Sequence, residues 1–240
     1  MISDLLLHVL GWRRPSETTI HRACFNNISG NPTTGRKMIL VISHTTYWDF
    51  FLFLLYLNAY SHYAKSMYIV MKPQPFDTFG WFLRRYNCIP ATRLEDSGDG
   101  FVDSMVNRFK SEDLYKIVIA PKGKTAKGPW RSGYYHIRQK LGCDIAVAGI
   151  DYERKYLYLG PVHRHEDIDD MSFSQLTSLL QEDMSEIVPL NMKQCEIPIV
   201  RPHDKNRVSL IDWTLAILVL MIVILLLYII YRVSRKRRKL

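Results

Sequence analysis

The sequence predicts an α/β fold with a mixed, largely parallel sheet flanked by helices, followed by one C-terminal transmembrane helix. Three observations predict it. Short apolar runs alternate with stretches long enough for helices, polar or proline-containing loops end these runs, and one long uncharged apolar stretch lies near the C-terminus. Strands interleaved with helices favour a sheet of parallel strands. The 240 residues, 48% of them hydrophobic, suffice for one domain with a core and one appendage.

The expected strands are short, mostly apolar runs. Lys37–Ile42 (KMILVI) suits a buried strand, and Pro121 ends the run that contains YKIVIA. The expected strands are 37–42, 67–71, 115–120, 144–151 and 155–159. The expected helices are 47–60, 76–86, 99–110, 132–141 and 172–187. A tight turn at Glu153-Arg154 joins the last two strands, and the polar stretch His163–Asp170 is expected to be a solvated loop.

The composition divides the chain into five segments. They are 1–36, an N-terminal segment; 37–200, the α/β domain; 201–212, a linker; 213–231, the transmembrane helix; and 232–240, a basic tail. Apolar residues of the first segment recur at helical spacing, which fits an interfacial helix or a plain core helix, and both interpretations stay open. These residues are Ile2, Leu5, Leu6, Val9 and Leu10.

The segment Trp213–Tyr231 contains no charge, glycine or proline. As a helix of about 1.5 Å per residue it spans about 29 Å, close to the hydrocarbon thickness of a bilayer. By the positive-inside rule, the basic tail behind it would place the C-terminus in the cytosol and the main domain on the opposite side of the membrane. The N-terminus, with its short apolar run and early Asp4, does not look like a secretory signal. Tail anchoring after synthesis leaves the domain in the cytosol, and it fits a span this near the C-terminus with no signal before it. We therefore expect a single-pass, tail-anchored protein whose domain faces the cytosol.

Charge and cysteine content exclude several classes of protein. Six cations lie in the last nine residues, and removing them from the formal net charge of +9 leaves +3, too little to indicate a nucleic-acid-binding face. The four cysteines lie far apart without a C-x-x-C pair, which argues against a zinc site or a disulfide scaffold and indicates packed, reduced thiols. They are Cys24, Cys88, Cys143 and Cys195.

His44 and Asp49 are the candidate catalytic pair. His44 lies where a buried strand ends and an apolar helix begins, the place where α/β sheets present functional groups and where free backbone N–H groups attract anions. A carboxylate that holds one imidazole nitrogen leaves the other free as a base that activates a hydroxyl. A satisfied structural histidine is the alternative. A second pair, His165 and Asp170, lies in the polar stretch expected to be a loop.

Four sequence blocks in order resemble the glycerophospholipid acyltransferase superfamily, in particular the lysophosphatidic acid acyltransferases. They are His44–Asp49 (HTTYWD), Cys88–Arg93 (CIPATR), Ile119–Thr125 (IAPKGKT) and Trp130–Ile137 (WRSGYYHI). The resemblance covers about residues 37–160. His44 and Asp49 match the family's H-x-x-x-x-D block, and the resemblance implies that they are catalytic. It also implies a substrate-binding set of Arg93, Lys122, Gly123, Lys124, Thr125 and Arg131.

By this resemblance, His44 takes the proton of a hydroxyl on a lysophospholipid or glycerol phosphate, and that oxygen attacks the thioester of an acyl-CoA. Acyl-CoA is a co-substrate, no cofactor or metal is expected, and membrane lipids are expected partners, whereas nucleic acid is not. The activity implied is that of a 1-acylglycerol-3-phosphate O-acyltransferase. No acyl-enzyme is required, in agreement with the absence of a G-x-S-x-G motif.

One position departs from the family pattern. Lys122 stands where the family carries glutamate, and the block at Asp144–Gly149 lacks the usual terminal proline. In one interpretation the pocket has become a more cationic cradle for phosphate. In the other, activity is lost or altered, and the chain is a lipid-binding member of the same fold. A tail-anchored interaction protein without this activity is the third hypothesis.

Overall fold

The computed structural model describes residues 2–13, 37–59, 66–91, 100–123, 128–191, 193, 195 and 197–200. Contacts divide the chain into two units, Met1–Pro202 and His203–Leu240, and every described residue belongs to the first. The predicted transmembrane helix at 213–231 and the basic tail therefore lie outside the described residues. Within those residues, every helix falls short of the length and hydrophobicity that a bilayer crossing requires.

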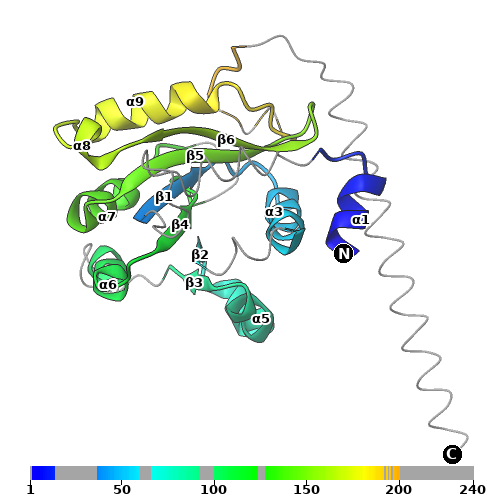
Figure 1. Cartoon of the computed structure of the whole chain (residues 1–240), viewed down its shortest axis with the longest axis horizontal. Coiled ribbons are helices and arrows are strands. Elements are labelled where there is room, and N and C mark those ends of the chain that lie inside the picture. Colours follow the sequence, from blue (N-terminus) through cyan, green and yellow to red (C-terminus); the bar gives the residue numbers. More distant parts are fainter. Residues whose placement is uncertain are drawn as a thin grey trace, which may run out of the picture. The chain divides into compact units, whose positions relative to one another are not determined.

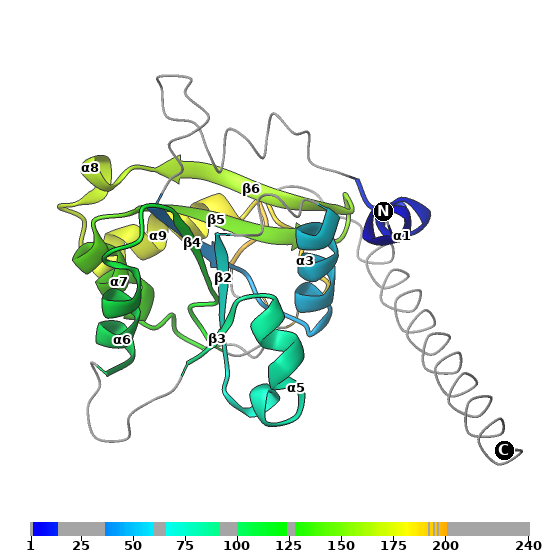
Figure 2. The ribbon, with the colours of Figure 1, turned by 60° about the horizontal axis from the view of Figure 1, so that its bottom comes forward.

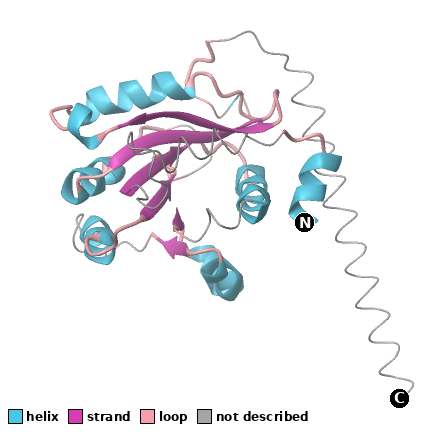
Figure 3. Ribbon diagram, viewed as in Figure 1, coloured by secondary structure: helices cyan, strands magenta, loops and turns pink. Residues whose placement is uncertain are grey.

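A six-stranded sheet forms the centre of the domain, with strand order β3-β2-β4-β1-β5-β6. Its strands are β1 (Lys37–Ile42), β2 (Met67–Met71), β3 (Cys88–Pro90), β4 (Tyr115–Ile119), β5 (Asp144–Asp151) and β6 (Tyr156–His163). Neighbouring strands are parallel except β5 and β6, which are antiparallel. The sheet is therefore mixed and largely parallel, as the sequence predicts. Figure 3 shows its strands together between the helices.

Helices cover both faces of the sheet (Figures 1 and 2). A hydrophobic core cluster packs one face against α6 (Gly100–Phe109), α7 (Gly133–Leu141) and α9 (Phe173–Met184). The other face is covered by α3 (Trp48–Ala59) and α5 (Gln74–Arg85), and α1 (Ile2–Val9) lies beside α3. The crossovers between parallel strands are right-handed. Along the sheet the chain moves in one direction from β1 to β3 and in the opposite direction from β3 to β5, so the helices of these two sets of crossovers lie on opposite faces.

The central strands are apolar because helices cover both of their faces. All five residues of β4 are buried, as are the four inner residues of β1. β3 is a three-residue edge strand to which the apolar pattern assigned no strand. It is too short for a periodic signal, and Pro90 is tolerated there because an edge strand needs fewer ladder hydrogen bonds.

The prediction of a solvated loop at His163–Asp170 was wrong. β6 extends to His163, and α8 (His165–Ile168) follows it. Ile168 is buried in the core cluster that α6, α7 and α9 share with the sheet, and His163 Nε2 lies 2.6 Å from Asp183 Oδ2 on α9. The acidic composition of this stretch concealed one core residue and one contact between β6 and α9, because polar residues dominate its exposed side.

The N-terminal helix α1 packs beside α3. Leu7 is fully buried and Trp12 nearly so, while Leu5 and Val9 stay exposed. Backbone bonds tie the end of this segment to the β5–β6 turn, since Arg13 N donates to Lys155 O over 2.6 Å. The segment therefore contributes side chains to the domain's core.

Candidate active site

The candidate site lies at the carboxyl ends of β1 and β4. These strands are parallel neighbours, and their last paired residues are Val41 and Ile119. From β1 the chain crosses to β2 on one side, and from β4 it crosses over β1 to β5 on the other. Neighbouring strands whose connections diverge leave a crevice at their carboxyl ends, the usual ligand position in open α/β sheets. The His44 loop follows β1 and the Lys122 loop follows β4, so both loops lie at this crevice.

The structure brings His44 and Asp49 together. His44 Nδ1 lies 3.4 Å from Asp49 Oδ2, and the His44 side chain is 24% exposed whereas that of Asp49 is 9% exposed. Asp49 lies in the first turn of α3, and His44 lies in the loop between β1 and that helix. Because Nδ1 faces the carboxylate, Nε2 is the ring nitrogen available to a substrate. Catalytic contacts of this length commonly tighten when substrate binds.

Three further groups hold the Asp49 carboxylate. Its Oδ2 accepts hydrogen bonds from the backbone N–H groups of Thr45 and Thr46, at 2.8 and 3.0 Å. Its Oδ1 accepts a hydrogen bond from the Tyr152 hydroxyl at 2.8 Å. With His44, these groups occupy both carboxylate oxygens. Hydrogen bonds to the ionised form fix its orientation, so the carboxylate is a rigid support for the imidazole ring.

Tyr152 is a site residue that the sequence analysis missed. It directly follows β5, which runs parallel to β1 and continues three residues past the pairing of Ile42 with Ala148. That overhang brings the fully buried Tyr152 to the site edge, where its ring packs edge-on against Trp12 with centroids 5.5 Å apart. The signal in the sequence that could have identified Tyr152 is its position directly after a strand that ends at the same edge of the sheet as His44.

The loop after β4 supplies the cationic part of the site. Arg131 N donates to Pro121 O over 3.1 Å, and this bond closes the loop. Gly123 takes a left-handed conformation with φ of +61°, and a Cβ there would lie 4.0 Å from Arg131 Nη1. The structure therefore places Lys122, Gly123 and Arg131 in one loop at this edge of the sheet, and their role in substrate binding stays a prediction. The other predicted substrate-binding residues, Arg93, Lys124 and Thr125, lie outside the described residues.

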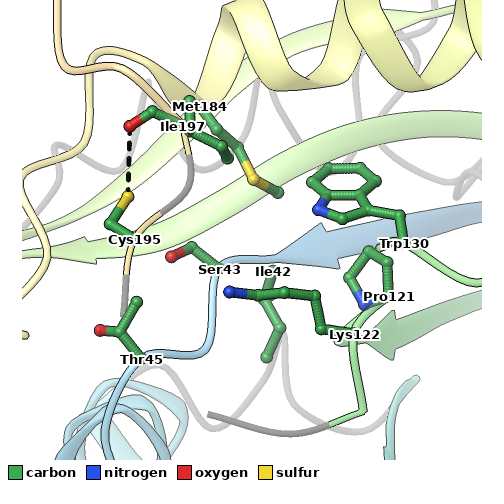
Figure 4. A pocket seen from close by; sticks show the side chains of 9 residues that line it. All are labelled: Ile42, Ser43, Thr45, Pro121, Lys122, Trp130, Met184, Cys195 and Ile197. Carbon is green, nitrogen blue, oxygen red and sulfur yellow. Dashed lines mark hydrogen bonds between the residues drawn. The ribbon is translucent and has the colours of Figure 1, made fainter. Parts of the chain in front are cut away.

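A small pocket lies between the two loops (Figure 4). Its lining consists of Ile42, Ser43, Thr45, Pro121, Lys122, Trp130, Met184, Cys195 and Ile197. Figure 4 shows the Lys122 side chain extending toward Ser43. The buried Thr45 Oγ1 has no hydrogen-bond partner among the described residues, so a bound polar group can satisfy it. Sequence reasoning missed Met184, Cys195 and Ile197, which reach the pocket from α9 and the segment behind it.

The geometry defines a histidine–carboxylate base beside a cationic loop at the switch point of an α/β sheet. A family model described as Acyltransferase matches residues 24–151, which include His44, Asp49, Lys122, Gly123 and Arg131. The match covers more than half of the chain, and the chain belongs to the glycerophospholipid acyltransferase family. Neither the curated proteins nor the solved structures include a match to the chain. Its domain has an acyltransferase role in general, with an acyl donor and a lipid acceptor as substrates.

Proposed function

We propose that this protein transfers a fatty acyl group from acyl-CoA to a free hydroxyl of a lysophospholipid or glycerol phosphate. The observation that carries the proposal is the His44–Asp49 pair, with Nδ1 and Oδ2 3.4 Å apart and the carboxylate held by three other groups. The family membership supports the acyl-transfer class. The phosphate-bearing acceptor is supported by Lys122 and Arg131, whose loop lies at the same crevice.

The reaction needs one base and no covalent enzyme intermediate. His44 Nε2 accepts the proton of the acceptor hydroxyl while the oxygen forms a bond to the thioester carbonyl carbon. The resulting tetrahedral intermediate collapses, the C–S bond breaks, and the imidazolium returns the proton to the departing CoA thiolate. Asp49 orients the ring and stabilises its cationic form between these two transfers. The Thr45 hydroxyl lies in the pocket wall, where it can donate to a substrate oxygen.

The proposal includes a membrane location. A lysophospholipid and its acylated product both partition into a bilayer, so an anchored enzyme meets them where they are concentrated. The apolar segment 213–231 supports a single-pass anchor by its length and composition. The proposal puts the domain on the cytosolic side. Protease protection of the domain in sealed membranes tests this orientation.

A catalytically impaired, lipid-binding protein is the second candidate. Lys122 favours it, because this cation stands in the pocket wall where the family carries a carboxylate. The same chemistry of phosphate recognition serves both candidates, so only turnover separates them.

The test is transfer by the purified full chain from labelled acyl-CoA to a panel of lysophospholipids and glycerol phosphate. We expect transfer by the wild type and a decrease of roughly 10²–10⁴-fold in His44→Ala, the usual contribution of a general base. His136→Ala is the matched control, since His136 is exposed on α7. Lipid binding without turnover would support the second candidate. An equal loss in both variants would remove His44 from the mechanism.

A further inference from the structure

Exposed apolar side chains are concentrated on one face of the domain. Among the large hydrophobic side chains that the structure describes as exposed, all but Val200 lie on α1, α3 and α5 or directly before α3. They are Leu5, Val9, Tyr47, Phe51, Phe79 and Trp81. None lies on α6, α7 or α9, which cover the other face of the sheet. Exposed apolar groups gathered in this way indicate a contact surface.

A hydrogen bond and a series of ring contacts link the exposed side of α3 to α5. Phe51 and Asn58 are both exposed on α3 and are seven residues apart, which places them on the same side of that helix. Asn58 Nδ2 donates to the Tyr86 hydroxyl at the end of α5 over 3.0 Å. From there ring contacts lead along α5, with centroids 5.0 Å apart for Tyr86 and Phe82 and 5.9 Å apart for Phe82 and Trp81. Figures 1 and 2 show α3 and α5 side by side. We call Tyr47, Phe51, Phe79, Trp81, Phe82 and Tyr86 the aromatic face.

A kink in α5 exposes two of these rings together. In a regular helix, side chains two residues apart point about 200° away from each other. Phe79, however, has non-helical backbone angles, φ −118° and ψ 19°. Phe79 and Trp81 are consequently 57% and 75% exposed, while Gly80 between them is buried. The helix thus presents both large rings to solvent, at the free energy cost that exposed aromatic surface carries in water.

The charges around the aromatic face are mainly positive. Lys72, Arg84 and Arg85 are exposed at the two ends of α5, against one exposed acid on that helix, Asp77. The side of the opposite face that α8 and α9 form has the reverse bias. Exposed or partly exposed acids gather on and beside α8 and α9: Glu166, Asp167, Asp169, Asp170, Glu182, Asp183 and Glu186. A negatively charged surface would therefore attract the aromatic face and repel the far side.

We propose that the aromatic face docks on the surface of a phospholipid bilayer and brings the active site to headgroup level. Aromatic rings bordered by arginines match the membrane–water interface, where ring bodies meet acyl chains and cations meet phosphates. Tyr47, 78% exposed, lies between His44 and Asp49 in the same loop, so the docked surface begins within the catalytic block. The inference rests on the proposed function, because a lipid acceptor must reach His44 from the bilayer.

The test locates two labelled positions relative to lipid. The full chain, with Cys24→Ser and Cys195→Ser, receives an environment-sensitive fluorophore at Trp81→Cys. The matched control is Ser178→Cys, an exposed position on α9 of the opposite face. Both are mixed with vesicles of phosphatidylcholine and a minor fraction of phosphatidylglycerol, in which some acyl chains carry a nitroxide quencher. We expect strong quenching at position 81 and none at position 178.

Equal quenching at the two positions, or none at position 81, would overturn the proposal, as would failure of the chain to sediment with the vesicles. Protection of position 81 from an aqueous quencher before lipid is added would instead indicate a second copy or a protein partner on this face, and would also overturn it. Labelling at Phe51→Cys provides an independent readout. In the chain labelled at position 51, the double substitution Arg84→Glu and Arg85→Glu should weaken binding to the anionic vesicles by about fivefold or more for each cation replaced.

The transfer assay on the wild-type chain, which keeps Cys195 in the pocket wall, separates the two proposals when it is set beside the quenching result. Quenching without transfer would remove the proposed function and leave the docking surface. Transfer without quenching would remove the docking surface alone.

Discussion

The Tyr152 hydroxyl donates a 2.8 Å hydrogen bond to Oδ1 of Asp49, across 103 positions of sequence. The bond joins the end of β5 to the first turn of α3. It occupies the carboxylate oxygen that faces away from the His44 contact, since Oδ2 meets His44 Nδ1 and two backbone N–H groups. Tyr152 therefore positions the carboxylate that positions the base.

Removing this phenol should slow turnover more than it weakens substrate binding. A hydrogen bond to a charged group contributes about 1.5–3 kcal/mol, so we expect Tyr152→Phe to lower kcat about tenfold or more with KM nearly unchanged. Steady-state kinetics measure the two parameters separately. The control is Tyr156→Phe, whose hydroxyl accepts only a surface bond from Arg154 at 3.2 Å. A similar decrease in both variants would show that Tyr152 has a merely structural effect.

Reversing the charge at Lys122 tests the cationic loop. If its ammonium group contacts the acceptor's phosphate, Lys122→Glu should raise KM for phosphate-bearing acceptors roughly tenfold or more, with a smaller change in kcat. Lys110→Glu, on an exposed residue behind α6, controls for net charge. A large gain in turnover in Lys122→Glu would contradict this expectation, because it would show that the native lysine impairs the site.

Two buried thiols should make the domain less stable in alkali. Burial raises the pKa of Cys88 and of Cys143 from the ordinary value of 9.0 to about 12. In the unfolded chain these thiols ionise near pH 9, whereas in the folded state they stay neutral until about pH 12. The stability that the two thiols contribute is therefore complete below pH 9 and is lost as the pH rises from 9 toward 12. The free energy of unfolding, measured in urea across this range, should fall steadily.

Cys143→Ala provides the control for this pH dependence. The variant should be less stable than the wild type at neutral pH, since it leaves a small cavity. It should nevertheless lose less stability between pH 9 and 12, because one titrating thiol is gone. Identical pH slopes in the two proteins would refute the assignment of the effect to Cys143.

Two glycines at the β5–β6 pair differ in how much space surrounds them. A Cβ at Gly160 would lie 2.5 Å from Val147 Cγ2, whose β-branched side chain has little freedom to move. At Gly149 the nearest atom, at 2.7 Å, is the terminal Cδ1 of Ile187, which can rotate away. We expect Gly160→Ala to lower the free energy of unfolding by about 1–3 kcal/mol, and Gly149→Ala by less.

Gly133→Ala is the matched control, since no atom lies within 4 Å of a Cβ there. Alanine at this first position of α7 should leave stability unchanged or raise it slightly, because alanine restricts the unfolded chain. Chemical denaturation of the three variants gives the ranking. A Gly160→Ala protein as stable as Gly133→Ala would show that Val147 yields without cost.

By itself the sequence determined the local features of this protein. The alternation of apolar runs predicted five of the six strands, and the spacing of His44 and Asp49 predicted a pair within one loop and one helical turn. The same blocks identified the family. These features are readable because strand periodicity, helix starts and contacts between residues five positions apart depend on neighbouring sequence alone.

Tertiary structure decided the rest of the site. The strand order places the Lys122 loop beside the His44 loop and extends β5 far enough for Tyr152 to reach Asp49. It also buries Ile168 and so turns an acidic stretch into α8. No local pattern encodes these contacts, because each depends on which strands pair and on how far one extends beyond its neighbour. Those outcomes are selected by packing of the whole sheet between its two helical layers.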